Sequence, residues 1–515
     1  MQITEEQLEV GCEGLSTGTP PEDCVAVIFG ASGDLSHKEL IPSLYQLGCQ
    51  KLLPDSFAVI GFARRGWDNE AFRREMYEAT KRASDNFRDE FWETFAKRLF
   101  YVRGNFNDDP AESYAALKST IGDIQSNFAM PDNVLFHLSV PASSYSTIIK
   151  RLDTASLSRS ERGWRRVIIE KPFGSDEKSA RELDREIRNV FAEEQIYRVD
   201  HYLGKETVQN MLAFRFANPG FEPIWNRNYI DNVQITAAEE EGIGTRAGFY
   251  EQTGVVRDMM QNHLLQLLCM TAIEPPINFD ADSLHTETLK VLKSICSLNV
   301  EKNCVLGQYA RGRVKGQQAA AYREERGVAE DSATPTFAAL KLNLDNWRWA
   351  DVPFYLRTGK RLGRKINEVT IQFKPTPHLM FPNQKNRSQR NMLTFRLQPH
   401  EGILQTFQAK RPGAELQLEP VRMNFCYDTT FGIERPPSAY QWLLLDAMQG
   451  DRTLFPHAEW IYQAWSVIDP IVKRWEERPW HKVPNYEAGS WGPPAAADLI
   501  ERDGRQWYLS EDVIH

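Results

Sequence analysis

The stretch that decides the fold is Cys24–Asp34, which reads CVAVIFGASGD. Its first six residues form an unbroken apolar run, which is typical of a strand buried on both faces of a parallel sheet. Glycines directly after such a strand allow a tight turn and let the backbone approach a pyrophosphate closely, and the helix that follows offers free N–H groups. The spacing is G-x-x-G rather than G-x-G-x-x-G, so an ordinary strand-to-helix turn would show the same residues. Its position after the first buried strand favours a dinucleotide site.

Further apolar runs repeat this strand-and-turn pattern along the first part of the chain. They lie at 57–62, 133–140 and 167–169, separated by helical, charge-rich stretches such as 69–98. This alternation predicts a parallel sheet with crossover helices. We therefore expect a polar leader over residues 1–22 and a Rossmann-like, dinucleotide-binding α/β domain over residues 23–199.

The second half of the chain has a different pattern. From Asp231 onward, apolar and polar residues alternate with period two, as in antiparallel strands with one solvated face. These segments lie at 233–237, 337–344, 369–373, 393–397 and 403–407. They predict an α+β domain over residues 200–515 that contains a large, mainly antiparallel sheet.

Composition excludes several classes of protein. The 515 residues include 61 basic and 70 acidic side chains, a net charge of −9, which argues against a nucleic-acid partner. No apolar stretch approaches the ~18 residues that a membrane crossing needs. The seven cysteines are scattered and form no C-x-x-C motif. This pattern predicts reduced thiols in the cytoplasm, without a disulfide framework or a zinc site.

A basic pair follows the second apolar run, at Arg64 and Arg65. In a dinucleotide fold this strand end faces the adenosine ribose, where an acidic residue favours NAD and an arginine accommodates the 2′-phosphate of NADP. Two solvated surface arginines would give the same sequence. Given a coenzyme turn, we favour NADP, with Arg64 beside its 2′-phosphate.

Two polar motifs follow predicted strand ends. Lys171 stands in Glu170-Lys171-Pro172 after the run 167–169, where ligands of open α/β sheets bind, although a surface salt bridge of Glu170 is an equal alternative. The segment 200–205 reads DHYLGK. If it is helical, His201 and Lys205 are neighbours on one face and could hold a phosphate, but a solvated helix start would carry the same charges.

A histidine lies in the apolar helical pattern around residue 260. Val255, Met259 and His263 form one stripe at helical spacing. A lone histidine on such a stripe is more often a core residue than a catalyst. Its charge state can nevertheless be tuned near neutral pH, as a general base requires.

Taken together, these motifs resemble the glucose-6-phosphate dehydrogenase family. The resemblance rests on GASGDL (30–35), EKPFG (170–174), RVDHYLGKE (198–206), RDMMQNHLLQ (257–266) and VPFYLRTGK (352–360), in this order. It extends from about residue 24 to Trp507. It implies oxidation of glucose 6-phosphate to 6-phosphoglucono-δ-lactone, the first step of the oxidative pentose phosphate pathway, with NADP as coenzyme and NAD as a weaker alternative. It also implies a homodimer formed through the large sheet, with a tetramer as the alternative.

The resemblance also implies roles for individual residues. His263 matches the family's catalytic base, and Asp200 matches the carboxylate that orients it. Hydride transfer to a nicotinamide needs no metal, so we expect none. Residues matching the sugar-phosphate site are Lys171, His201, Tyr202, Lys205, Glu239, Asp258 and Lys360. Residues matching the coenzyme site are Gly30, Ser32, Gly33, Asp34, Leu35, Arg64 and Lys171. A catalytically silent relative would have lost His263, Asp200 or Lys205, and an enzyme for unphosphorylated sugars would not need His201, Tyr202 and Lys205.

Three positions depart from the family pattern. Glu39 lies where a basic residue is common near the coenzyme turn, which bears on the strength of the NADP preference. Some members bind a second, structural NADP beside the large sheet through basic side chains. Trp491 and Thr370 replace two of these arginines here. We therefore predict that this chain has no second NADP site.

Overall fold

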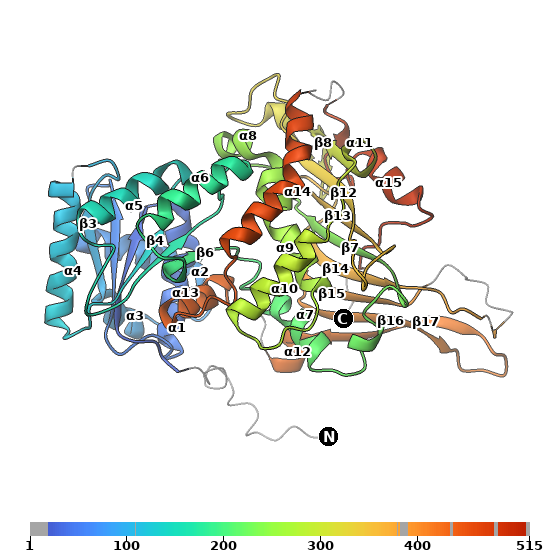
Figure 1. Cartoon of the computed structure of the whole chain (residues 1–515), viewed down its shortest axis with the longest axis horizontal. Coiled ribbons are helices and arrows are strands. Elements are labelled where there is room, and N and C mark those ends of the chain that lie inside the picture. Colours follow the sequence, from blue (N-terminus) through green and yellow to red (C-terminus); the bar gives the residue numbers. More distant parts are fainter. Residues whose placement is uncertain are drawn as a thin grey trace.

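The computed structural model describes residues 19–510 except 109, 379, 382–389, 433–435 and 478–482. Most of the expected leader therefore lies outside the described residues. Figure 1 shows two sheets beside each other, the one nearer the N-terminus on the left and the other on the right, with helices between them. Within the described residues, no helix combines the length and the apolar character that a membrane crossing requires.

The first sheet is parallel throughout, as predicted. Its strand order is β3-β2-β1-β4-β5-β6, with bounds Leu99–Arg103, Phe57–Ala63, Cys24–Phe29, Val134–Leu138, Arg165–Ile169 and Ile196–Arg198. All six residues of β1 are buried. Cys24, Ala26 and Ile28 enter one apolar core, and Val25, Val27 and Phe29 enter the other. A strand with period two must be apolar at every position when both faces are covered, which explains the unbroken run.

Helices cover both faces of this sheet (Figure 1). They are α1 (Ile41–Cys49), α2 (Asn69–Ala83), α3 (Asp89–Ala96), α4 (Ala115–Asn127), α5 (Tyr145–Thr154) and α6 (Glu177–Arg188). The predicted helical stretch 69–98 is two helices, because residues 84–88 leave helical geometry between them. Strands β3 and β6 were not predicted. Each is short, and neither is an unbroken apolar run.

The second sheet has the order β17-β16-β15-β14-β7-β13-β12-β8. The bounds in that order are Leu418–Cys426, Gly402–Lys410, Met392–Gln398, Ile366–Phe373, Ile230–Ala238, Pro353–Gly359, Phe337–Asn343 and Cys304–Gly307. Neighbouring strands are antiparallel except β7 and β13, which are parallel. The prediction of a large, mainly antiparallel sheet is confirmed. The parallel pair matters for the site, because both of its carboxyl ends lie at the same edge.

The remaining α-helices and the π-helix η7 belong to the second half of the chain, and several of them lie between the two sheets (Figure 1). They are α7 (Glu206–Phe216), α8 (Ala247–Val255), the π-helix η7 (Val256–Leu264), α9 (Leu265–Ala272), α10 (Ala281–Lys293), α11 (Val300–Asn303), α12 (Tyr427–Phe431), α13 (Ala439–Gln449), α14 (Ala458–Glu477) and α15 (Pro494–Glu501). Two of them return to the first domain: α13 packs on α1, and α14 packs on α6. One apolar core accordingly runs through both halves of the chain.

Candidate active site

The turn after β1 holds the predicted coenzyme residues at the carboxyl end of the parallel sheet. Gly30 has a φ of +82°, and a Cβ atom there would lie 2.1 Å from the carbonyl oxygen of Ser139, after β4. Strand order reverses between β1 and β4, and the crevice at such a switch point is where α/β sheets bind ligands. Ser32, Gly33, Asp34 and Leu35 follow in exposed or half-buried positions. The glycine and the position of the turn fit a dinucleotide whose pyrophosphate lies against the backbone.

Arg64 follows β2 directly and is exposed. Its neighbour Arg65 is also exposed, and the Arg65 guanidinium lies 5.0 Å from the centre of the Trp67 ring. This strand end is next to the coenzyme turn, because β1 and β2 are parallel neighbours. A cation at this place can reach a phosphate on the adenosine ribose.

Three structural elements meet at His263. Asp200 follows β6, and its Oδ1 lies 2.5 Å from His263 Nδ1. Lys171 follows β5, and its Nζ lies 2.8 Å from His263 Nε2. The Lys171 ammonium also donates to the Asp258 carboxylate at 3.1 Å and to the Asp258 carbonyl at 3.0 Å. Parallel strands β5 and β6 are neighbours, so their carboxyl ends bring Lys171 and Asp200 together at the π-helix η7.

The charges around His263 favour a neutral imidazole. Burial lowers the pKa of His263 well below its ordinary value, and the ammonium of Lys171 lowers it further. Burial alone would raise the pKa of Asp258, but Lys171 and Lys360 together lower it to about 2. Burial raises the pKa of Asp200. When the Asp200 carboxylate accepts a hydrogen bond from Nδ1–H, Nε2 carries no proton and accepts the hydrogen bond from Lys171. Nε2 is then the position at which this imidazole can act as a base.

The segment 201–205 is a series of turns, and α7 begins only at Glu206. The helical interpretation of this segment was therefore wrong: the chain must turn from the end of β6 into α7 within these residues. His201 and Tyr202 instead surround the base, with ring centres 4.6 Å and 4.3 Å from that of His263. The Lys205 ammonium lies 4.6 Å from the centre of the Tyr202 ring and donates to Gln398 at 3.3 Å.

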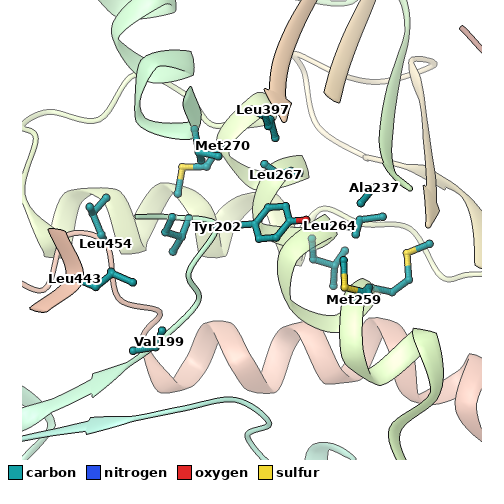
Figure 2. Close-up of a cluster of buried hydrophobic side chains, with 14 of the residues drawn as sticks. Val199, Tyr202, Ala237, Met259, Leu264, Leu267, Met270, Leu397, Leu443 and Leu454 are labelled. Carbon is teal, nitrogen blue, oxygen red and sulfur yellow. The ribbon is translucent and has the colours of Figure 1, made fainter. Parts of the chain in front are cut away.

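Apolar packing fixes the Tyr202 ring. Figure 2 shows Tyr202 beside Leu264 and Met259 of the π-helix, with Val199 below. The side chain is only 4% exposed. Burial also acts on its neighbours: it lowers the pKa of Lys205 to about 8 and that of His201 well below its ordinary value.

Glu239 and Lys360 form an ion pair at the edge where β7 and β13 end. Each residue comes directly after its strand, and the strands are parallel neighbours, so the two side chains must lie side by side. The Lys360 ammonium also lies 5.4 Å from the centre of the Tyr250 ring. The attraction between Lys360 and Asp258 links this pair to the group around Lys171.

A cavity of about 450 Å³ joins the two predicted sites. Its walls include Leu35 from the coenzyme turn and His201 and Lys205 from the sugar-phosphate candidates. Other wall residues were not predicted from the sequence: Glu206, Gln398, Glu401, Ser438 and Tyr440. Glu206 begins α7 directly after Lys205. The other four come from β15, the loop after it and the start of α13, and no local motif connects these segments to residues 200–205. Glu39, the position that departs from the family, is also in the wall.

Among the described residues, one set of donor atoms in the site lies close enough together to be considered for a metal ion. Donor atoms of Asp200, His201 and His263 lie within 4.8 Å of one another. However, Lys171 Nζ is bonded to His263 Nε2, and both Lys171 and Lys205 act electrostatically on this histidine. Two ammonium groups repel a cation, so the set suits an anionic ligand better.

Fold and site together define a class of protein. Leu35 of the coenzyme turn lines one cavity with His201 and Lys205, and the buried His263–Asp200 pair lies against His201. This is the arrangement of a nicotinamide-dependent oxidoreductase acting on an anionic substrate.

Comparison with known proteins specifies the family. The family model described as "Glucose-6-phosphate dehydrogenase, NAD binding domain" matches residues 27–210, and the one described as "Glucose-6-phosphate dehydrogenase, C-terminal domain" matches residues 212–508. The chain belongs to the glucose-6-phosphate dehydrogenase family, a family of oxidoreductases. The matches meet between residues 210 and 212, beyond the expected domain boundary at 199, which stays a prediction.

Relatives match over nearly their whole length. The chain is 44% identical to glucose-6-phosphate 1-dehydrogenase of Aggregatibacter actinomycetemcomitans, covering 94% of this chain and 97% of that protein. It is 42% identical to glucose-6-phosphate 1-dehydrogenase 2 of Mycobacterium tuberculosis, covering 94% of each. A solved glucose-6-phosphate dehydrogenase in complex with its substrate glucose-6-phosphate aligns with a TM-score of 0.87 and 32% identity, covering 96% of this chain and 100% of that one.

Proposed function

We propose that this enzyme oxidises glucose 6-phosphate to 6-phosphoglucono-δ-lactone with NADP as coenzyme, and so starts the oxidative pentose phosphate pathway. The observation that carries the proposal is the hydrogen-bonded group of Asp200, His263 and Lys171. His263 lies against His201, which lines the same cavity as Leu35 of the coenzyme turn. NADP, when bound at the coenzyme turn, would supply the hydride acceptor for oxidation of the anomeric carbon. The protein must hold the sugar in place and remove the proton of the anomeric hydroxyl.

His263 is the proposed general base. Its Nε2 is free of a proton at neutral pH and receives the hydroxyl proton, and the Asp200 carboxylate at Nδ1 stabilises the imidazolium that forms. The Lys171 ammonium is hydrogen-bonded to the same Nε2 at 2.8 Å. The sugar hydroxyl would replace Lys171 as the hydrogen-bond donor to Nε2. Lys171 is then available to contact both substrate and coenzyme.

The sugar phosphate is proposed to bind His201, Tyr202 and Lys205. The Lys205 ammonium is half-buried and donates to the neutral amide of Gln398. Among the described residues it forms no salt bridge, although the Glu401 carboxylate acts on it electrostatically, and an incoming phosphate would supply a direct counter-charge. Glu239, Asp258 and Lys360 are proposed to hydrogen-bond the sugar hydroxyls. Gly30, Ser32, Gly33, Asp34 and Leu35 are proposed to hold the pyrophosphate. No metal takes part in these steps.

The coenzyme preference rests on Arg64. Its exposed guanidinium supports NADP over NAD, because a 2′-phosphate gives it a partner at the end of β2.

We also propose a single coenzyme site per chain. Trp491 stands where some family members have an arginine that binds a second NADP. Its ring lies 5.3 Å from the guanidinium of Arg357 on the large sheet, and the Trp507 ring lies 4.3 Å from the same group. This cation is therefore in contact with tryptophan rings.

The proposed assembly is a cytoplasmic homodimer formed through the large sheet, with a tetramer as the alternative. Strand β17 is an edge strand of that sheet, and its Met423 is 59% exposed. An exposed edge strand with apolar side chains favours association. Sedimentation of the purified chain tests this, because a monomer at micromolar concentration would contradict it.

The activity is tested by measuring the ultraviolet absorbance of the reduced coenzyme as it forms. Glucose 6-phosphate should be oxidised with both coenzymes and faster with NADP at subsaturating concentration. Unphosphorylated glucose serves as the matched control and should react far more slowly. No absorbance change with glucose 6-phosphate and either coenzyme would refute the proposal.

A further inference from the structure

The first turn of α13 contacts the coenzyme domain at two carboxyl groups, the half-buried Glu39 and the buried Glu170. Ser438 caps this helix, and its hydroxyl group donates a hydrogen bond to the Glu39 carboxylate at 2.9 Å. Tyr440 donates to Oε2 of Glu170 at 3.3 Å. Although α13 is far along the chain, it packs on α1 of the first domain (Figure 1). The turn therefore crosses from the sugar-binding half to the coenzyme half at the wall of the active-site cavity.

Tyr440 faces two residues of the proposed site. Its ring is nearly parallel to that of His201, at 9° and 6.3 Å between ring centres. Its hydroxyl bonds to Glu170, the residue directly before Lys171. The side chain is 9% exposed, so both contacts are made away from bulk water. A single side chain thus touches a phosphate-site histidine and the strand end that carries Lys171.

Glu170 is held from several directions. Tyr145 donates to its carbonyl oxygen at 2.6 Å, which fixes the backbone. Its Oε1 lies 3.5 Å from His137 Nε2 on β4, and within the described residues that oxygen has no hydrogen-bond partner. Burial raises the pKa of Glu170 to about 8, against the opposing effects of the Tyr440 bond and of Lys171. The carboxyl group is therefore mostly protonated at neutral pH, and it leaves the charge of Lys171 free for His263 and Asp258.

We propose that Tyr440 and Glu170 are positioning residues for the hydride-transfer reaction, in which the tyrosine hydroxyl holds Glu170 so that Lys171 points at His263 and Asp258. The inference rests on the proposed function. Neither side chain touches reacting atoms in this scheme. Their effect passes through Lys171, whose ammonium makes contacts of 2.8 Å and 3.1 Å that a small displacement of the strand end would break. Displacements of this size in a positioned group can cost about 100-fold in rate.

The variant Tyr440→Phe tests the role of the hydroxyl and keeps the ring beside His201. A matched control is available in Tyr462→Phe, because Tyr462 also donates to a carboxylate of the coenzyme domain, Asp184, at 2.5 Å, but it joins α14 to α6. We expect kcat of Tyr440→Phe to fall about tenfold, with the KM for glucose 6-phosphate changed less than about threefold. Tyr462→Phe should keep the wild-type kcat. Equal kcat values in the two variants would show a purely structural bond and overturn the proposal.

A double-mutant cycle tests whether the two residues act as a pair. Glu170→Ala should lower kcat, and Glu170→Gln should restore most of that loss, since the amide keeps the shape and the acceptor. Adding Tyr440→Phe to Glu170→Ala should cause no further loss, whereas multiplicative losses would contradict the pair. If Glu170→Ala does not fold, the cycle is made with Glu170→Gln, where Tyr440→Phe should retain its full effect. An inactive wild-type enzyme would refute the proposed function instead, so the two failures are distinguishable.

Discussion

Replacement of Asp200 by asparagine separates two roles of this carboxylate. Its Oδ1 accepts hydrogen bonds from His263 Nδ1 at 2.5 Å and from the Tyr202 backbone N–H at 3.0 Å. An asparagine has the same shape and can present its Oδ1 to both donors. We therefore expect Asp200→Asn to keep the His263 tautomer that leaves Nε2 unprotonated. What it removes is the negative charge beside the imidazolium that forms during proton transfer.

The expected loss follows from the strength of this one hydrogen bond. Bonds to charged groups contribute about 1.5–3 kcal/mol, and neutral ones about 0.5–1.5 kcal/mol. The difference is about 1–1.5 kcal/mol, which corresponds to about a 5- to 15-fold decrease in kcat. Both side chains are buried, at 3% and 1% exposed, so solvent screens their attraction weakly and the upper end is expected.

Steady-state kinetics with glucose 6-phosphate and NADP measure this effect. The control is His263→Asn, which removes the base itself. If Asp200→Asn lowered kcat as much as His263→Asn, the tautomer would have been lost, and the argument from the shared Oδ1 would be refuted. An unchanged kcat would equally contradict it, because the charge would then have no role.

Three further predictions follow from the same site. His263→Asn should lower kcat by about 10²–10⁴-fold with substrate binding largely kept, and a near-normal rate would remove His263 as the base. Since the pKa of Lys205 is about 8, its ammonium loses its proton as the pH rises through that value, so the KM for glucose 6-phosphate should rise above about pH 8. Lys205→Met should have a raised KM at neutral pH and no such alkaline rise, and a parallel pH profile would exclude Lys205. Arg64→Ala should raise the KM for NADP much more than that for NAD, as initial rates with each coenzyme would show, and equal losses would contradict a 2′-phosphate contact.

Several strands of the first half could be predicted because a strand that is buried on both faces appears in the sequence as an unbroken apolar run. The run Cys24–Phe29 had to be apolar at every residue once both faces of β1 were covered, and the glycine after it had to accept a φ of +82°. Strands β3 and β6 contain no such run. They are short, and β3 includes partly exposed and exposed residues, so only their pairing with β2 and β5 defines them.

The sequence indicated which chemical groups the candidate residues carry, but it did not indicate how these groups are arranged in space. Residues 200–205 carry the right side chains, yet they form turns rather than the helical face that was considered. His263 looked like a core residue on an apolar stripe. His263 lies in the π-helix η7. Its hydrogen-bond partners Asp200 and Lys171 follow strands and are 63 and 92 residues away in the sequence. Contacts of that separation have no periodicity for a sequence pattern to show.

The sequence by itself determined the two kinds of sheet, the glycine turn and the residue types of the site, because each depends on local burial or local backbone geometry. The tertiary structure alone decided which of these residues meet. Parallel pairing of β5 with β6 and of β7 with β13 places Lys171 beside Asp200 and Glu239 beside Lys360. The return of α13 to α1 brings Tyr440 to Glu170 across 270 residues. These long-range contacts form when whole helices and strands pack against one another. The free energy that favours them is distributed over both hydrophobic cores and does not depend on any single segment.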